Sequence, residues 1–224
     1  MLKKRLSLLL SLFIICASIY VANVGVSPAV SVASQISPAK TIIIDAGHGG
    51  EDGGASALDG TLEKDINLKI ALQTAKLLKL YGFEVIMTRE SDTSTSSGES
   101  FIKREDLEYR LNLMKQNPES IFVSIHLNKF TTSAARGSQV FYSKFENSKL
   151  LGDLIQNSII LNLQRENKRV NKQATSSTFL LHKATVPAVL VECGFLSNEA
   201  ELSRLKDSAY QKKLAFCIAD GILQ

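Results

Sequence analysis

Short apolar runs alternate with segments of helical periodicity along most of this 224-residue chain. Runs such as 41–46, 121–125 and 187–191 have the length and composition of buried strands. Between them, residues 63–81 repeat apolar side chains at the spacing of a helix. Strands that alternate with helices favour parallel pairing, with helices packed on both faces. We therefore expect an α/β fold, a single domain built on a mostly parallel, twisted sheet of about six strands.

The expected elements follow from the same patterns. We expect strands at residues 41–46, 83–88, 121–125, 139–142, 179–181 and 187–191. We expect helices at residues 63–81, 104–116, 149–163 and 210–223, and a helix cap at residues 197–201. We find no internal repeat and no second domain in the sequence.

The N-terminal segment, residues 1–33, differs from the rest in charge and hydropathy. It begins with a basic cluster at residues 3–5, continues with a mostly apolar stretch at residues 6–24, and contains no acidic residue. This order is typical of an export signal, but the apolar stretch also reaches the length of about 20 residues that a membrane anchor needs. We expect residues 1–33 to be a cleaved signal peptide or an uncleaved anchor, residues 34–40 a linker, and residues 41–224 the folded domain.

The charge balance excludes one class of partner. The chain has 26 basic and 22 acidic residues, and three of the basic residues lie in the N-terminal segment. The remainder is therefore close to neutral, which gives no indication of nucleic-acid binding. We expect no nucleic-acid partner, and contact with a membrane only through the N-terminal segment.

Two cysteines lie beyond the N-terminal segment. An exported pair could form a disulfide. However, Cys193 adjoins an expected strand and Cys217 lies on the apolar face of an expected helix. We therefore favour two buried free thiols.

Side chains that can bind a metal come just after three of the expected strands. These side chains are His48, His126 and Glu192. Because the carboxyl ends of parallel strands meet at one edge of a sheet, we expect two imidazoles and a carboxylate to lie close together there. A carboxylate after five apolar residues also needs a cation or a hydrogen-bond partner, which favours a functional role for Glu192.

Glu63 is the candidate for a third ligand. It begins the first expected helix, which returns the chain to the same edge of the sheet. His48, Glu63 and His126 then form a two-histidine, one-carboxylate set of the kind that binds catalytic zinc. Taken alone, Glu63 could instead stabilise the N-terminus of its helix. His182 has a lysine neighbour and no glycine-rich loop, so we expect it at the surface or behind the ligands.

Other catalytic motifs are missing from the sequence. The glycine-rich stretch 47–54 has Asp52 where a dinucleotide-binding motif requires its third glycine, and it lacks the lysine of a phosphate-binding loop. Neither the Gly-x-Ser-x-Gly motif nor the His-Glu-x-x-His motif is present. Cys193 is also a poor candidate for a nucleophile, because neighbours in a strand point to opposite faces and Glu192 is expected to face the site.

Four ordered segments of the chain resemble the zinc-dependent N-acetylmuramoyl-L-alanine amidases. The segments are residues 43–50, 63–68, 124–128 and 187–198. The resemblance implies that His48, Glu63 and His126 bind Zn²⁺ and that Glu192 is the catalytic carboxylate. It also implies a peptidoglycan substrate, a glycan strand that carries its stem peptide. Leu127 replaces a small residue of the family pattern, a change that could narrow the substrate groove.

Within this family the chain is most similar to the spore-cortex amidases of endospore formers. The similarity is carried by residues 60–66, residues 104–107 with Arg110, the short export segment and the lack of wall-binding repeats. It implies an exported protein, secreted or membrane-anchored, that acts outside the cytoplasm on the route to muramic-δ-lactam. The forespore intermembrane space is one such location, and an accessory lipoprotein partner is left open.

Two other functions stay open at this point. The chain could be a catalytically inactive module that binds peptidoglycan or regulates its turnover. It could also be a zinc peptidase of similar fold that cuts within the stem peptide. The presence of all four chemical residues favours the amidase.

Overall fold

The structure of the protein is a computed structural model that describes residues 41–96 and 101–224. The strands are β1 (Thr41–Ala46), β2 (Glu84–Met87), β3 (Ile121–Asn128), β4 (Gln139–Tyr142), β5 (Lys172–Gln173) and β6 (Ala188–Phe195). The helices are α2 (Glu63–Leu80), α3 (Lys103–Gln116), α4 (Ser148–Asn162), α5 (Phe179–Lys183), α6 (Glu199–Lys206) and α7 (Ser208–Leu223). The predicted N-terminal segment and linker lie outside the described residues, so their boundaries stay predictions.

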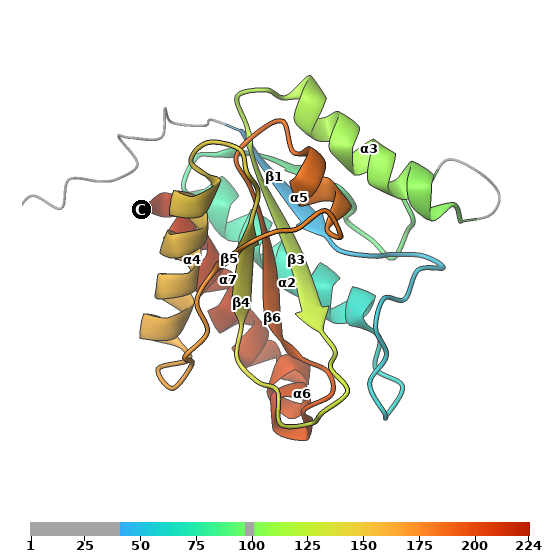
Figure 1. Cartoon of the computed structure of the whole chain (residues 1–224), viewed down its shortest axis with the longest axis vertical. Coiled ribbons are helices and arrows are strands. Elements are labelled where there is room, and N and C mark those ends of the chain that lie inside the picture. Colours follow the sequence, from blue (N-terminus) through green and yellow to red (C-terminus); the bar gives the residue numbers. More distant parts are fainter. Residues whose placement is uncertain (1–40, 97–100) are drawn as a thin grey trace, which may run out of the picture. The chain divides into compact units, whose positions relative to one another are not determined.

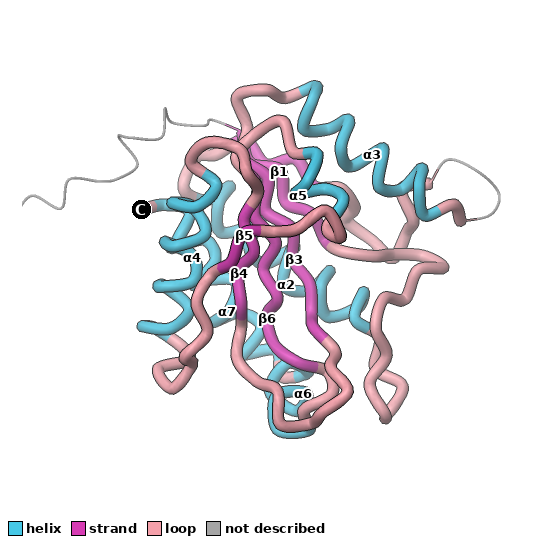
Figure 2. The backbone as a smooth tube through the Cα atoms, viewed as in Figure 1, coloured by secondary structure: helices cyan, strands magenta, loops and turns pink. Residues whose placement is uncertain are grey.

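The strands form one six-stranded sheet in the order β2-β1-β3-β6-β4-β5. The first four run parallel, whereas β4 runs antiparallel to β6 and parallel to β5. Figures 1 and 2 show β3 and β6 side by side in the middle of this sheet. The predicted α/β fold with a mostly parallel sheet is therefore confirmed.

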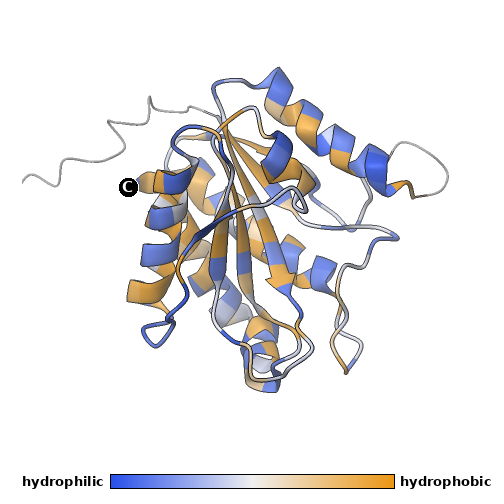
Figure 3. Ribbon diagram, viewed as in Figure 1, coloured by the Kyte–Doolittle hydropathy of each residue, from blue (hydrophilic) through white to orange (hydrophobic). Residues whose placement is uncertain are grey.

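Helices cover both faces of the sheet and create two hydrophobic cores. In Figure 1, α3 and α5 lie in front of the sheet, and α2 and α7 lie behind it. The larger core joins the sheet to α2, α4 and α7 and includes Ile42 and Ile44, while Ile43 belongs to the smaller core on the α3 and α5 side. This alternation explains the continuous apolar run of β1, because a strand covered on both faces buries every side chain. Figure 3 shows the strands as hydrophobic over most of their length.

One predicted strand was wrong, and one short strand was missed. Residues 179–181, predicted as a strand, form the start of helix α5. A run of three apolar residues does not distinguish a strand from a buried helical turn, and β3 and β6 already have partners on both sides. Strand β5 was missed, because its two residues are polar and exposed and carry no hydrophobic pattern.

Strands β3 and β6 are longer than their apolar runs. Both continue through the predicted polar ends, so His126 and Glu192 lie inside strands. Leu127 is only 3 % exposed and packs in the larger core, so the expectation that it narrows the groove was wrong. Cys193 and Cys217 are buried free thiols, as predicted.

The other expected helices are present, and the predicted cap at residues 197–201 is confirmed. Asn198 precedes α6 and accepts a hydrogen bond from the backbone amide of Glu201. None of the helices in the described ranges is long and apolar enough to cross a membrane.

A buried ion pair connects β1 to α3. The guanidinium of Arg110 binds the carboxylate of Asp45 and donates to Asp106 from Nε at 2.9 Å. Arg110 is 2 % exposed and Asp45 is fully buried. Burial by itself would raise the pKa of Asp45, but the charge of Arg110 and a hydrogen bond from Ser124 outweigh it and lower that pKa. Asp45 is therefore ionised, and its charge is balanced inside the protein.

We expect Asp45→Asn to lower the free energy of unfolding by about 3 kcal/mol, because it removes one of the two buried carboxylates that bind Arg110 and leaves only Asp106. Denaturant titration at neutral pH measures this effect. The control is Glu108→Gln, which breaks the exposed pair of Arg104 and Glu108 on the same helix and should cost about 0.5 kcal/mol or less.

The stability of Asp45→Asn at acid pH provides a second test of the role of Asp45. Because the folded pKa of Asp45 is lowered, its stabilising contribution is complete above the unfolded pKa of about 3.9 and is lost as the pH falls below it. The difference between the native protein and Asp45→Asn should therefore shrink in acid. A difference that stays constant down to low pH would contradict the assignment.

Candidate metal centre

The structure brings together His48, Glu63 and His126, three residues far apart in the sequence. One potential ligand atom from each lies within 4.8 Å of the others. His48 Nε2 is 3.3 Å from Glu63 Oε2, and His126 Nδ1 is 2.9 Å from Glu63 Oε1. His48 follows β1, Glu63 begins α2, and His126 lies in β3. The three elements meet at the carboxyl edge of the sheet, as the topology of parallel strands predicts.

Glu63 is the centre of this cluster and is held from several sides. Its carboxylate accepts hydrogen bonds from the backbone amides of Ala55 and Leu127, at 2.9 and 3.1 Å, and from the side-chain amide of Asn67 at 3.2 Å. Burial by itself would raise the pKa of Glu63, but hydrogen bonds with the two imidazoles outweigh it and lower that pKa strongly. The carboxylate is therefore ionised and fixed in orientation before any metal binds.

His48 is oriented by a carboxylate that the sequence analysis did not single out as functional. Its Nδ1 lies 2.8 Å from Asp52 Oδ2, which leaves Nε2 directed toward Glu63. Burial disfavours the charged imidazole, but Glu63 and Asp52 outweigh it and raise the pKa of His48 to about 8. A carboxylate on the far nitrogen of a ligating histidine fixes the ring and strengthens the ligand. The signal for Asp52 was its position four residues after His48 in a glycine-rich loop.

The backbone that carries His48 adopts an unusual conformation. His48 has a φ of 64°, in the left-handed region that residues other than glycine rarely occupy. Such a conformation costs about 1–3 kcal/mol and persists only when the surrounding structure holds it. The loop therefore needs support from elsewhere in the fold.

Two buried arginines provide that support. Arg110 donates to the carbonyl of His48 from Nη2 at 3.2 Å. Arg89 donates to the carbonyl of Ala46 at 3.0 Å and to that of Gly47 at 3.2 Å. The guanidinium groups thus satisfy three successive carbonyls that lead into and include His48. Sequence reasoning quoted Arg110 only as part of a family resemblance and missed Arg89, because neither the partners nor the burial of an arginine can be read from its local sequence.

Glycine is required where the backbone passes the imidazoles. A Cβ atom at Gly47 would collide with the ring of His126. At Gly54, where φ is +66°, a Cβ atom would lie 2.6 Å from His48 Cδ2 and 2.7 Å from Glu63 Oε2. The glycine-rich loop therefore allows the backbone to approach the candidate ligands closely.

Glu192 faces the same cluster from the neighbouring strand. It is the register partner of His126 in the parallel pair of β3 and β6. Its Oε2 atom is buried and has no hydrogen-bond partner within the described residues. Burial raises the pKa of Glu192 to about 7. The nearby imidazoles lower this pKa, and the charge of Glu63 raises it. A buried carboxylate without a partner is costly, which indicates that its partner is a substrate, a water or a metal.

A groove lies beside the ligands on the α3 and α5 face. Its volume is about 210 Å³, and its polar lining includes His48, Asp52 and His126. Its apolar lining consists of Leu107, Phe122, Phe179, Leu180, Leu181 and Leu190. His182 is on α5 but is exposed and lies outside this lining, in agreement with its expected surface position. The groove leaves room for a substrate next to the candidate ligands.

The alternatives to a metal site are weaker in the structure. Cys193 packs in the larger core, on the opposite face from Glu192, and burial raises the pKa of its thiol. A thiol without a tendency to ionise is a poor nucleophile.

The donor set fits zinc. Two ligands at about 2.1 Å from a tetrahedral ion lie about 3.4 Å apart. His48 Nε2 and Glu63 Oε2 are separated by 3.3 Å, and one potential ligand atom from each of the three residues lies within 4.8 Å of the others. Two imidazoles and one carboxylate leave a fourth position for water or substrate. The unpartnered oxygen of Glu192 lies beside this set.

Comparison with known protein families agrees with this geometry. The family model Amidase_3, described as N-acetylmuramoyl-L-alanine amidase, matches residues 42–224. The chain belongs to this amidase family.

Individual relatives extend the comparison. The chain is 37% identical over 190 residues to the germination-specific N-acetylmuramoyl-L-alanine amidase of Bacillus subtilis (strain 168), an alignment that covers 83% of this chain and 79% of that protein. Among solved structures, it is similar to the CwlD amidase of Clostridioides difficile in complex with the GerS lipoprotein, with 43% identity and a TM-score of 0.77 over 81% of this chain and 95% of that chain. The amidase AmiC2 of Nostoc punctiforme is 32% identical, with a TM-score of 0.71 over 82% of this chain and 94% of that chain.

We expect Gly54→Ala to weaken zinc binding about tenfold or more, because the added methyl group displaces His48 and Glu63. Titration of the metal-free protein with zinc against a competing chelator gives the dissociation constant. The matched control is Gly60→Ala. Gly60 also has a positive φ, of +85°, but a Cβ atom there has nothing within 4 Å. The control should lose about 1 kcal/mol of stability and keep its zinc affinity. Equal zinc affinity in the two variants would contradict the proposed role of the loop.

Proposed function

We propose that this amidase depends on zinc and hydrolyses the amide bond between N-acetylmuramic acid and L-alanine in peptidoglycan. In this proposal His48, Glu63 and His126 bind Zn²⁺, and Glu192 is the catalytic carboxylate. The observation that carries it is the convergence of two imidazoles and an ionised carboxylate beside a second, unpartnered carboxylate. Membership of the amidase family supplies the reaction.

The chain's own residues account for the proton transfers of this hydrolysis. When bound, zinc would supply Lewis-acid chemistry, which polarises a carbonyl and lowers the pKa of a coordinated water toward about 7. Glu192 accepts a proton from the attacking water on its free oxygen as the new carbon–oxygen bond forms. It then returns the proton to the nitrogen of L-alanine as the carbon–nitrogen bond breaks. Burial of Glu192, which raises its pKa to about 7, suits a group that must both take and give a proton.

We expect Glu192→Gln to keep zinc but to lose hydrolysis by about 10²-fold to 10⁴-fold, the usual contribution of a general base. Purified peptidoglycan is the substrate, and mass spectrometry of the products identifies the bond that is cut. The control is Glu63→Gln, which should lose both zinc and activity because it removes a ligand. Full activity of Glu192→Gln would refute the role given to Glu192.

The same digest distinguishes the two other functions. New amino termini of L-alanine indicate the amidase, and a cut between amino acids of the stem peptide indicates a peptidase. A catalytically inactive binding module would release no peptide at all. The metal content discriminates further, because a pure binding module has no need for a catalytic metal.

We also propose a place of action outside the cytoplasm, in the spore cortex, as a step toward muramic-δ-lactam. One relative is named germination-specific, and a structural neighbour is a CwlD amidase, which supports this assignment. Residues 1–33 would export the chain and would be either cleaved or kept as an anchor. The forespore intermembrane space is the location that fits a cortex substrate.

Deletion of the gene in its host should yield spores whose cortex lacks muramic-δ-lactam. Muropeptide analysis of the purified cortex measures this loss. The native gene should restore the lactam, and Glu192→Gln should not. Normal lactam content in the deletion strain would place the enzyme in another part of the cell wall without affecting the assignment of the reaction.

An accessory lipoprotein is a further proposed partner. The solved CwlD structure is a complex with the GerS lipoprotein, and this chain is 43% identical to that CwlD. Zinc content of the purified domain, measured with and without a candidate lipoprotein, tests whether such a partner completes the metal site.

A further inference from the structure

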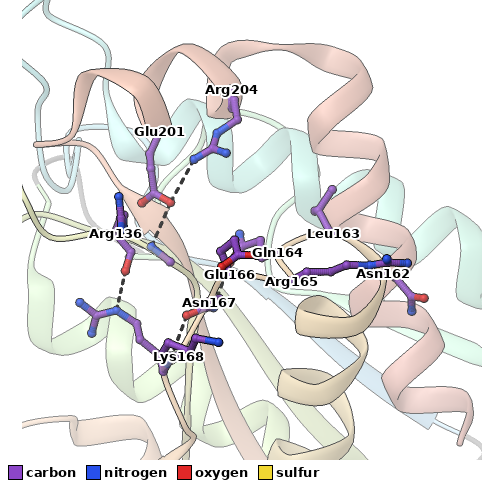
Figure 4. Close-up of a pocket in the computed structure, with 12 residues that line it drawn as sticks. Arg136, Asn162, Leu163, Gln164, Arg165, Glu166, Asn167, Lys168, Glu201 and Arg204 are labelled. Atoms are coloured by element: carbon purple, nitrogen blue, oxygen red, sulfur yellow. Dashed lines mark hydrogen bonds and ion pairs between the residues drawn. The ribbon is translucent and has the colours of Figure 1, made fainter.

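A cleft rich in arginine and lysine lies away from the candidate ligands. We call it the basic cleft and define it by Arg136, Arg165, Lys168, Arg169 and Arg204. Its volume is about 960 Å³. In Figure 4, Arg136 comes from the connection before β4, Arg165 and Lys168 from the loop after α4, and Arg204 from helix α6.

This clustering is unusual for the domain as a whole. Four of the 26 basic residues of the chain precede residue 41 and no acidic residue does, so residues 41–224 contain 22 basic and 22 acidic residues. A domain of zero net charge thus gathers five cations in one cleft. Two acidic residues, Glu166 and Glu201, also line it, which leaves a local net charge of +3.

Two of the five cations, Arg169 and Arg204, already contact other groups of the protein. Arg169 donates to the carbonyl of Arg136 at 2.7 Å and to Gln139 Oε1 at 3.0 Å, and its guanidinium lies 4.6 Å from the ring centre of Phe195. Arg204 lies 3.6 Å from the carboxylate of Glu201. These contacts fix the wall of the cleft, as the dashed lines in Figure 4 show for Arg204 and Glu201.

The other three cations are available to a ligand. Arg136, Arg165 and Lys168 are exposed, and none of them forms an ion pair with any residue in the described ranges. Glu201 does not compensate them, because its carboxylate accepts hydrogen bonds from the backbone amides of Gly137 and Phe195, both at 2.9 Å. The cleft therefore presents free positive charge to an anion.

The basic cleft lies next to the catalytic strand. Gln139, at the start of β4, is the register partner of Glu192 in β6. Neighbouring strands are about 4.8 Å apart, so Gln139 is one strand away from the carboxylate. The side chain of Gln139 accepts the hydrogen bond from Arg169, which joins this position to the wall of the cleft. A substrate held at Glu192 could therefore extend across β4 into the cleft.

We propose that the basic cleft binds the carboxylates of the stem peptide of peptidoglycan. This inference rests on the proposed function, since the amide at Glu192 joins the glycan to that peptide. The glycan has lost its lactyl carboxylate to the amide bond, so the negative charge of the substrate resides on the peptide. Several carboxylates spaced along a peptide match free cations on two segments, the connection before β4 and the loop after α4. Arg136, Arg165 and Lys168 would thus determine specificity for peptides with free carboxylates.

The test compares two muropeptides, one with free stem carboxylates and one in which they are amidated. The variant replaces Arg136, Arg165 and Lys168 by Gln. We expect it to lose about tenfold in kcat/KM on the free-carboxylate substrate, since three exposed ion pairs contribute up to about 0.5 kcal/mol each. On the amidated substrate the variant and the native protein should be equal. High salt should reduce the native preference for free carboxylates.

A charge-matched control replaces Lys69, Lys212 and Lys213 by Gln. These residues are exposed on α2 and α7, outside the cleft, and their loss should leave both substrates unaffected. Thermal unfolding checks that both triple variants fold. An equal loss on the two substrates, or no loss on either, would overturn the proposal.

Failure of the proposed function would have a different result, because the native protein would then cut the muramic acid–alanine amide in neither muropeptide. Calorimetric binding of a free stem peptide still tests the cleft in that case. The native protein should bind it more tightly than the cleft variant, and equal binding would overturn the proposal.

Discussion

The buried guanidinium of Arg110 is the interaction on which the geometry of the site depends. It binds Asp45 at the end of β1 and Asp106 on its own helix α3, and it also donates to the carbonyl of His48. A charge that is almost fully buried is tolerated only when every partner is in place. The first candidate ligand is therefore positioned by the same contacts that attach α3 to the sheet, so the site and that face of the fold are linked. The left-handed conformation of His48 is stable because this network holds it.

The surroundings shift the pKa values of two carboxylates at the site in opposite directions. Burial would raise the pKa of Glu63, but its hydrogen bonds and charge interactions with the two imidazoles lower it. Glu192 is half-buried, its Oε2 atom is buried without a hydrogen-bond partner in the described residues, and desolvation raises its pKa to about 7. This separation suits a permanently charged ligand next to a group that exchanges protons. The two carboxylates differ because Glu63 hydrogen-bonds to the imidazoles, whereas Glu192, the register partner of His126, has an Oε2 atom without a hydrogen-bond partner in the described residues.

The surfaces on the two sides of Glu192 differ in character. An apolar groove lies between the sheet and α3 and α5, and the basic cleft lies beyond β4. In the proposed assignments, the scissile amide of the substrate lies at the candidate ligands, and the charged stem peptide extends over β4 into the basic cleft. The antiparallel strand β4 makes this arrangement possible, because it brings the connection before it and the loop after α4 to the edge of the sheet where the ligands lie.

Much of the fold could be predicted from local patterns. The central strands are continuous apolar runs, and the main helices have clear periodicity, so their positions agree with the structure to within a few residues. The errors were α5 and β5, which are too short to carry a period. The candidate ligands could be named because parallel strands place their carboxyl ends at one edge. The choice of Glu63 as the third candidate ligand depended on the expected topology and also on the family resemblance.

The sequence by itself determined the α/β architecture, the order of the chemical residues and the family, because these depend on short-range periodicity and on motifs. Only the tertiary structure decided how the ligands are held. Asp52, Arg89 and Arg110 acquire their roles from partners in other loops and strands. The basic cleft likewise exists only after α6 and the loop after α4 come together. Electrostatic contacts act through space and depend on burial, and neither the distances nor the burial is written in the local sequence.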